Sequence, residues 1–149
     1  MSLITQFREK DFNTGFNHYE GVFEKTGIYF DILLMEENKK IEICDAENEI
    51  AIVIINGTGN IEYEDSKILF NRNDWIEHDP TVAHLAPNEG AIITSTTVTK
   101  AAIVKTPNSN TFKGMIYTPA DIDTEHRGKD QLDNTCYRLV RLADRKSVV

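Results

Sequence analysis

The chain has 149 residues, which is enough for one hydrophobic core without disulfides or a structural metal. Hydrophobic residues make up 40% of it and charged residues 27%, so the composition is that of a folded domain and excludes a disordered chain. The net charge of −8 argues against nucleic acid and anionic membranes as partners, because both repel an acidic surface. The sequence contains no recognisable signal peptide or membrane-spanning run, so a cytoplasmic location is expected.

The segment 1–25 is polar and aromatic, and it predicts an irregular strand or an arm lying over another surface. A first period-two strand follows, with apolar residues at positions 28, 30, 32 and 34. Residues 40–44 alternate cleanly and predict a strand with one face in water. The run 49–55 is β-branched and apolar on both faces, which is typical of a central buried strand.

A hairpin is predicted directly after that buried strand. Asn56-Gly57 is a strong turn signal because both residues tolerate positive φ. Further strands are predicted at 60–64, 67–70, 81–85, 91–98, 101–104 and 115–117, with short helical pieces at 119–124 and 130–134. About nine short strands with turn signals every 8 to 12 residues, and no βαβ alternation, favour an antiparallel sandwich or barrel.

Two stretches of the chain together carry a resemblance to a known family. The first is the strand 49–55 with its glycine turn and the later Asp74-Trp75-Ile76, which resemble the middle of a cupin barrel. The second is Glu125-His126-Arg127-Gly128-Lys129 ahead of an apolar strand. Together they resemble the N-terminal half of the bacterial 5-deoxyglucuronate isomerases, which are related to the 5-keto-4-deoxyuronate isomerases of pectin breakdown, and the second stretch resembles the link between the two halves of those enzymes. The resemblance covers about residues 15–142.

The resemblance implies an all-β fold, a single cupin-type (jelly-roll) β-barrel with a short irregular C-terminal segment. We expect an N-terminal arm over about residues 1–25, the barrel over about 26–118 and the C-terminal segment over about 119–149. The isomerases that the chain resembles are double cupins of about twice this length. The chain is then a freestanding half, the partner of another chain, or a truncated double cupin.

The resemblance also implies that the metal site belongs to the C-terminal cupin, so no metal or other cofactor is expected on this chain. The residue pattern agrees with that expectation. A cupin usually supplies a His-x-His pair just before its central glutamate, whereas residues 41–45 contain no histidine and Glu49 lacks such neighbours. The four histidines are scattered along the chain, at His18, His78, His84 and His126.

His84 is the candidate catalytic residue and a candidate substrate-binding residue. It lies on a strand that we expect to line the barrel, where it could bind a polar ligand or act as a general base. A structural histidine with satisfied hydrogen bonds is the alternative. His126 and Arg127 are the other candidate substrate-binding residues, because an arginine fork can hold a sugar carboxylate. A solvated charged loop, or a strut against a neighbouring subunit, is the alternative for these two.

Two aromatic residues, Trp75 and Tyr63, could stack on a sugar face or serve as core or interface aromatics. Cys44 and Cys136 are expected to be buried or half-buried thiols in a reducing compartment. A homodimer is expected, because cupin barrels often pair through their sheets and the aromatic N-terminal arm suits exchange with a neighbour.

Two functions remain open at this stage. One is the reaction that the resemblance implies in myo-inositol catabolism, the aldose–ketose isomerisation of a deoxyuronate, which needs a base and an electrophile that is commonly a divalent metal. Little or no such activity is expected of this chain alone. The other is a non-catalytic sugar-binding or scaffold cupin module. A small sugar acid is the expected ligand, with no nucleic acid and no membrane as partner.

Overall fold

The computed structural model describes residues 11–127 and 137–142, with the side chains of residues 11–124. Within this part the helices are two short turns, and none is long or apolar enough to cross a bilayer. The strands are β1 Gly15–His18, β2 Tyr29–Met35, β3 Lys40–Cys44, β4 Asn48–Tyr63, β5 Ser66–Arg72, β6 Val82–Leu85, β7 Gly90–Ser95, β8 Thr99–Pro107, β9 Met115–Tyr117, β10 Ile122–Arg127 and β11 Tyr137–Leu142. The helical turns are α1 Phe23–Thr26 and the 3₁₀ turn η1 Pro119–Asp121.

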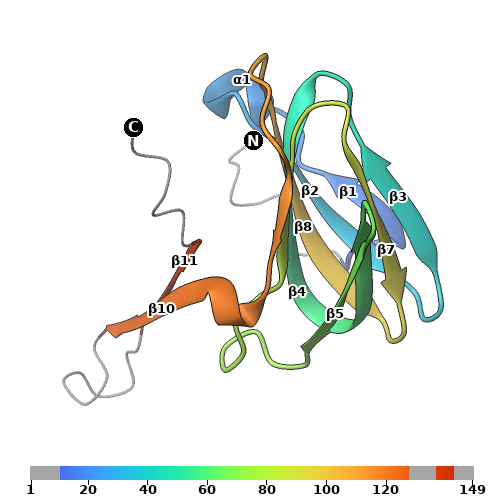
Figure 1. The fold of residues 1–149 in the computed structure, drawn as a ribbon, viewed down its shortest axis with the longest axis vertical. Coiled ribbons are helices and arrows are strands. Elements are labelled where there is room, and N and C mark those ends of the chain that lie inside the picture. Colours follow the sequence, from blue (N-terminus) through green and yellow to red (C-terminus); the bar gives the residue numbers. More distant parts are fainter. Residues whose placement is uncertain (1–10, 128–136, 143–149) are drawn as a thin grey trace.

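The barrel consists of two antiparallel layers that share one long strand, β4 (Figure 1). One layer has the strand order β1-β2-β8-β4-β6-β9. In the other layer, β7 pairs with both β3 and β4, and β5 pairs with the second half of β4. The strands β10 and β11 pair with each other in a separate two-stranded sheet. The described residues therefore form the all-β jelly-roll barrel that the sequence predicts.

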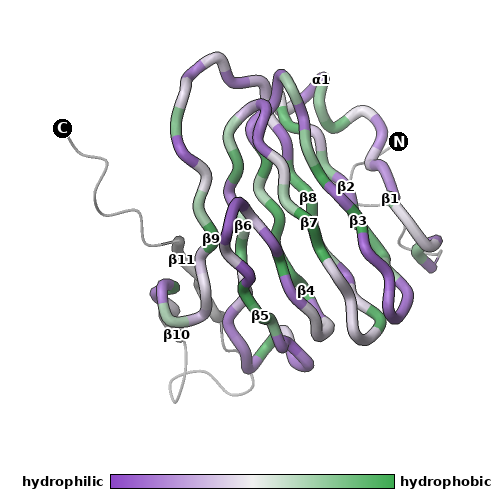
Figure 2. The backbone as a smooth tube through the Cα atoms, turned by 45° about the vertical axis from the view of Figure 1, so that its right-hand side comes forward, coloured by the Kyte–Doolittle hydropathy of each residue, from purple (hydrophilic) through white to green (hydrophobic). Residues whose placement is uncertain are grey.

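The lumen of the barrel is filled with aliphatic side chains. On β4, residues Ile50, Ile52 and Ile54 point inward and have no exposed surface. Figure 2 shows the same apolar character along β4, β7 and β8. Burial of one such side chain contributes about 1.5 to 3 kcal/mol, so this layer is the main stabilising element of the fold. The other members of the cluster include Leu33, Met35, Ile43, Ile61, Tyr63, Phe70, Leu85, Ile93 and Ile103.

The hairpin predicted at Asn56-Gly57 is wrong, because β4 continues through these residues without a turn. The register against β8 shifts between Ile54 and Asn56, which marks a bulge where the strand leaves one layer and enters the other. Gly57 has a φ of 123°, and a Cβ there would lie 2.3 Å from the hydroxyl oxygen of Thr99. Glycine is therefore required at this position, because β4 and β8 approach each other closely. The dipeptide Asn56-Gly57, which commonly forms a turn, allows a bend in this strand.

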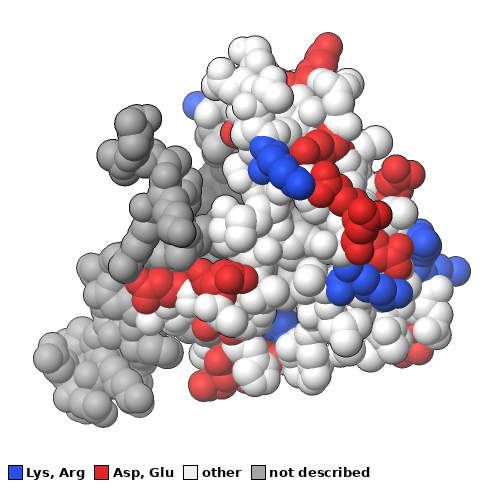
Figure 3. Space-filling view, viewed as in Figure 1, with Lys and Arg blue, Asp and Glu red and all other residues white. Residues whose placement is uncertain are grey.

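Charged side chains gather on the side of the barrel that carries β3 and β7 (Figure 3). Glu62 of β4 lies between Lys40 of β3 and Lys67 of β5, at 3.7 Å and 3.1 Å from their ammonium nitrogens. The Glu62–Lys67 pair joins the neighbouring strands β4 and β5, and the Glu62–Lys40 pair reaches across β7, which lies between β3 and β4. The barrel thus separates an aliphatic interior from a charged exterior, as the alternation within 40–44 predicts.

Arg72 closes the end of the barrel at which β5 finishes. Its guanidinium donates hydrogen bonds to the carbonyl oxygens of Ile54 at 2.6 Å, His78 at 2.9 Å and Trp75 at 3.0 Å. These acceptors lie on β4 and on the loop between β5 and β6, so one buried side chain ties the loop to the bend of β4. The planar fork of arginine suits several acceptors at once.

The substitution Arg72→Lys is expected to lower the free energy of unfolding by about 2 kcal/mol, because a lysine ammonium cannot reach three divergent carbonyls and leaves some unpaired. Urea denaturation followed by circular dichroism measures this difference. Lys67→Arg, on the exposed pair with Glu62, is the control and should change the free energy of unfolding by less than about 0.5 kcal/mol. Equal effects of the two substitutions would contradict the anchoring role of Arg72.

The segments outside the barrel strands differ in part from expectation. Within the N-terminal arm, residues 15–18 form β1, and α1 was not predicted. Residues 119–121 form a 3₁₀ turn, but the helical expectation is wrong for 122–124, which begin β10. The helical piece expected at 130–134 lies outside the described residues.

Three side chains that the sequence singles out settle smaller expectations. Cys44 is exposed on β3, so the expectation of a buried or half-buried thiol is wrong for it, while Cys136 lies outside the described residues. Tyr63 is buried in the core, as one of its two interpretations predicts. Trp75 is exposed in the loop between β5 and β6, so it is no core residue.

Candidate functional site at the barrel mouth

A polar layer lies above the aliphatic core, at the end of the barrel where β2 and β4 begin. Asp31 of β2 pairs with Ile103 of β8, and Lys105 of β8 pairs with Ile50 of β4. Directly paired residues share one face of a sheet, and both isoleucines are fully buried in the core. Asp31 and Lys105 therefore lie on the inner face of the barrel, one step of the pleat beyond the aliphatic layer.

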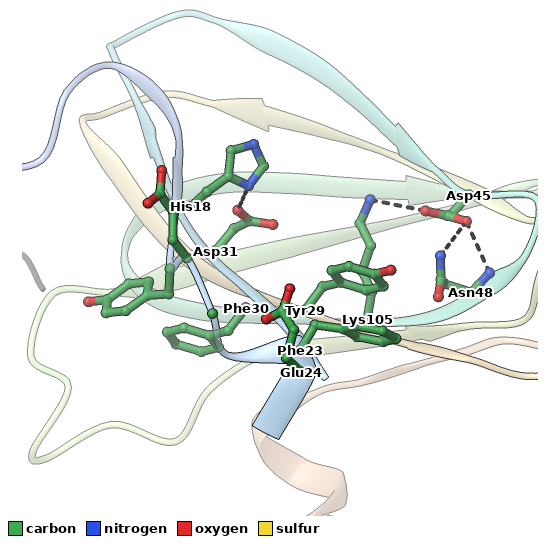
Figure 4. Close-up of a pocket in the computed structure, with 12 residues that line it drawn as sticks. His18, Phe23, Glu24, Tyr29, Phe30, Asp31, Asp45, Asn48 and Lys105 are labelled. Carbon is green, nitrogen blue, oxygen red and sulfur yellow. Dashed lines mark hydrogen bonds and ion pairs between the residues drawn. The ribbon is translucent and has the colours of Figure 1, made fainter. Parts of the chain in front are cut away.

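A pocket of about 390 Å³ opens at this end and is called the mouth pocket below. Aromatic rings lie along one side of it, and polar side chains along the other (Figure 4). Its lining residues are Tyr19, Phe23, Tyr29 and Phe30, the carboxylates Glu20, Glu24, Asp31 and Asp45, and His18, Gly21, Asn48 and Lys105.

Asp31 is the most deeply placed carboxylate of the mouth pocket, with 4% of its surface exposed. It pairs across the β1–β2 ladder with His18, and the Nδ1 atom of His18 contacts the Asp31 carboxylate. The side chain of His18 is 75% exposed, so the imidazole lies at the rim and the carboxylate beneath it. A buried carboxylate needs a positively charged or hydrogen-bonding partner, and the ring nitrogen of His18 is the partner that contacts Asp31.

Asp45 organises the turn between β3 and β4. Its Oδ1 accepts hydrogen bonds from the backbone N–H groups of Glu47 and Asn48 and from the Asn48 amide, and its Oδ2 lies 3.2 Å from Nζ of Lys105. Burial raises the pKa of Asp45, but the hydrogen bonds from Glu47, Asn48 and Lys105 outweigh it and lower the pKa to about 2. Asp45 and Lys105 are therefore an ion pair at neutral pH.

The aromatic side of the pocket is built by α1 and the start of β2. Phe23 and Tyr29 stack with ring centroids 4.1 Å apart and an interplanar angle of 10°. Tyr19 and Phe30 meet edge to face, with centroids 5.0 Å apart. α1 ends at Gly27, whose φ of 73° reverses the chain into β2 and brings the two stacked rings together. These rings give the pocket flat apolar surfaces next to its carboxylates.

The mouth pocket has the chemistry of a site for small polar ligands. Carboxylates and the Asn48 amide can bind hydroxyl groups, and aromatic faces can cover the C–H surface of a ring. Among the described residues, no donor reaches Oδ1 of Asn48, although this atom is buried. A buried acceptor without a donor costs free energy.

The structure places His84 on the outer face of the barrel, so the expectation that it lines the lumen is wrong. His84 pairs with Ala51, and both side chains lie opposite to the buried Ile50 and Ile52. Its Nε2 lies 3.4 Å from a carboxylate oxygen of Glu49. Successive side chains of a strand point to opposite faces of the sheet. Where the residues on both faces are apolar, the sequence does not show which face of the sheet lines the lumen.

Around His84 the outer face holds a small cluster. Its ring lies 4.8 Å from that of Phe112, and Glu49 also accepts a hydrogen bond of 2.9 Å from Asn108. The adjoining hollow measures about 100 Å³. Glu49 is therefore no lumen glutamate, and the cluster connects β4 and β6 with the loop between β8 and β9.

The other two candidate residues belong to the C-terminal hairpin. His126 and Arg127 lie on β10, paired with Arg138 and Tyr137 of β11. Their side chains lie outside the described set, so their contact with a sugar carboxylate stays a prediction. Among residues with described side chains, no three of His, Cys, Asp or Glu converge to hold a metal ion.

Sequence reasoning missed the mouth pocket almost entirely. It assigned the apolar face of the first strand to positions 28, 30, 32 and 34, whereas the inner face carries Tyr29, Asp31, Leu33 and Met35. The available signal was Asp31, a charged residue inside an otherwise apolar strand. The approach of Asp45 to Lys105, which are 60 residues apart, carries no local signal.

Comparison with known proteins gives the family. The model of the KduI/IolB family matches residues 4–146, nearly the whole chain. The chain belongs to the KduI/IolB family. The resemblance to the deoxyuronate isomerases is thereby confirmed at the level of the family. No curated protein sequence matches the chain.

Solved structures support the cupin fold of this family member. An IolB-like protein from Salmonella typhimurium LT2 superposes with a TM-score of 0.66 at 18% identity, over 78% of this chain and 46% of that protein. The cupin domain of Cnp3 from Schizosaccharomyces pombe superposes with a TM-score of 0.51 at 10% identity, over 72% of this chain and 68% of that chain. The chain spans less than half the length of the IolB-like protein.

The ion pair of Asp45 predicts a pH-dependent contribution to stability. The pKa of Asp45 is about 2 in the folded state against 3.8 for a free side chain, so its contribution is complete above pH 3.8 and is lost as the pH falls toward 2. Asp45→Asn should lower the free energy of unfolding by about 2 kcal/mol at neutral pH, and the difference should vanish near pH 2.

Urea denaturation of both proteins across this pH range measures the effect. Glu47→Gln is the matched control, since it removes one carboxylate charge from the same turn but is exposed. A loss that is equally large at neutral and at acid pH would show that Asp45 acts through packing instead of charge.

Proposed function

We propose that this member of the KduI/IolB family is a sugar-binding cupin barrel whose ligand site is the mouth pocket. The main observation that supports this proposal is the abrupt change on the inner face of the barrel, from fully buried isoleucines to the charged residues Asp31 and Lys105. Charged groups at the edge of an aliphatic core cost free energy unless they are paired, as Asp31 is with His18 and Lys105 is with Asp45. Here they border an open pocket that also offers aromatic faces, which is the usual equipment for a small polar ligand.

The second candidate function is uronate isomerisation, which family membership favours. The family metal would supply the electrophile that stabilises an enediolate, and the resemblance assigns its ligands to a second cupin half. The fit is poor for the part of this chain with described side chains, because no three candidate ligands converge there. A contribution of this barrel to isomerisation would then consist of holding the sugar.

Binding is tested by titrating the ¹⁵N-labelled chain with glucose. Shift changes are expected at backbone amides of the mouth pocket, including those of Asp31, Asn48 and Lys105, and not at the opposite end near Arg72. Tyr29→Ala should weaken binding about five- to tenfold, because it removes an aromatic face. Leu69→Ala, on an exposed apolar residue outside the pocket, is the control and should bind as the unchanged chain does.

Absence of shifts at the mouth with glucose, glucosamine and glucuronate alike would refute the sugar-binding proposal. Isomerase activity is tested separately with a deoxyuronate substrate. The unchanged chain alone should show little or no turnover. Turnover that a chelator abolishes and a divalent metal restores would establish the second function instead.

We also propose a homodimer that forms through the outer face of β4 and β8. The register places Ala51 next to Val104 and Val53 next to Ala102 on that face, and all four side chains are partly exposed. An apolar sheet face favours association. Light scattering at micromolar concentration should give the mass of two chains, and the mass of one chain would contradict the proposal.

A further inference from the structure

The pair of Asp31 and His18 gives the mouth pocket a side chain that can move a proton. The two residues face each other across the β1–β2 ladder, and the Nδ1 atom of His18 contacts the Asp31 carboxylate. Because a carboxylate only accepts hydrogen bonds, this Nδ1 atom carries a proton. In the neutral imidazole the second nitrogen, Nε2, is then the proton acceptor. Asp31 therefore determines which nitrogen of His18 can act as a base.

The burial of these two side chains matches the roles of an orienting group and a base. The side chain of Asp31 is 6% exposed, whereas that of His18 is 75% exposed. His18 also lines the mouth pocket, so its imidazole lies at the rim, where a bound ligand is within reach. Figure 4 shows Nε2 on the side of the ring away from Asp31. A fixed carboxylate that orients an accessible imidazole is the arrangement of a general base and its positioning residue.

The rest of the pocket suits a pyranose as the molecule that gives up the proton. Its volume of about 390 Å³ lies within the usual range of small-molecule sites, about 300 to 1,000 Å³. The stacked rings of Phe23 and Tyr29 offer a flat surface for the C–H face of a sugar. The most acidic hydroxyl of an aldose is the one at the anomeric carbon, and loss of its proton opens the ring.

We propose that the mouth pocket catalyses the mutarotation of aldoses, with His18 as the catalytic base and Asp31 as its positioning residue. This inference rests on the proposed function, since it assigns a reaction to a sugar bound in the same pocket. An aldose–ketose isomerisation starts from the open-chain aldehyde. Ring opening here would supply the form of the sugar that such a reaction consumes.

The reaction needs only proton transfers and one reversible C–O cleavage. The Nε2 atom of His18 takes the proton of the anomeric hydroxyl, and the O–H electron pair forms the C1=O1 double bond. The bond between C1 and the ring oxygen breaks with its electron pair, and the ring oxygen takes a proton from water. The hydroxide so formed removes the proton from the imidazolium. Rotation about the C1–C2 bond and reversal of these steps close the ring as the other anomer.

Polarimetry measures this activity directly. Freshly dissolved α-glucose is mixed with the chain, and the approach of the optical rotation to equilibrium is followed. The rate should increase in proportion to the chain concentration, and by at least about tenfold more than with an equal concentration of free imidazole. His18→Gln should lower the chain-dependent rate at least about tenfold, because the base is lost. His78→Gln removes an exposed histidine at the opposite end of the barrel and should leave the rate unchanged.

Asp31→Asn tests the positioning role, because an amide can donate to Nδ1 and shift the imidazole proton to Nε2. The chain-dependent rate should fall at least about tenfold, while glucose still shifts the backbone amides of the mouth pocket. Long-range ¹H–¹⁵N spectra of the imidazole should show the proton on Nδ1 in the unchanged chain and on Nε2 in this variant. Circular dichroism spectra confirm that the variants are folded.

The outcomes keep the two proposals apart. Amide shifts together with a rate that depends on His18 support both. Amide shifts without acceleration beyond that of free imidazole refute the mutarotation and leave the sugar site standing. Equal rates in His18→Gln and His78→Gln would show catalysis by surface histidines in general and would also refute the inference. A slow Asp31→Asn variant whose proton stays on Nδ1 would refute the positioning role of Asp31.

Discussion

The passage of one strand through both layers of the barrel is the constraint on which the remaining structure depends. β4 pairs with β8 and β6 in its first half and with β5 and β7 in its second. The bend requires the close contact between Gly57 and Thr99, where no side chain fits. Because Ile50 to Ile54 come before this bend and Ile61 after it, a single strand supplies inward side chains to both layers.

That arrangement also determines where chemistry can take place. Among the described residues, aliphatic side chains fill most of the lumen, and Arg72 closes one end with three hydrogen bonds. The opposite end carries the polar layer of Asp31 and Lys105. The proposed ligand site therefore lies at the mouth, where charged side chains are only partly removed from water.

The sequence predicts the fold better than the site for a physical reason. Strand periodicity and turn residues are local signals, so β3 and β9 coincide with their predicted ranges. The face of a strand is not local when both faces are apolar, and this explains the errors at Asp31 and His84. Asn56-Gly57 illustrates a third case. The tolerance of glycine for positive φ suits a hairpin turn, and it equally suits the bend within a continuous strand that the structure shows. The ion pair of Asp45 with Lys105 exists only after the strands have assembled.

The exposed thiol of Cys44 provides a site for attaching a fluorescent label close to the mouth pocket. Cys44 directly precedes Asp45, which lines the mouth pocket, yet its side chain points outward from β3. A maleimide dye attached there would lie beside the opening without occupying it. Replacement of Cys136 by serine would leave Cys44 as the single labelling site. The fluorescence of the dye would then report whether a ligand occupies the pocket, and the one tryptophan of the chain would add little background.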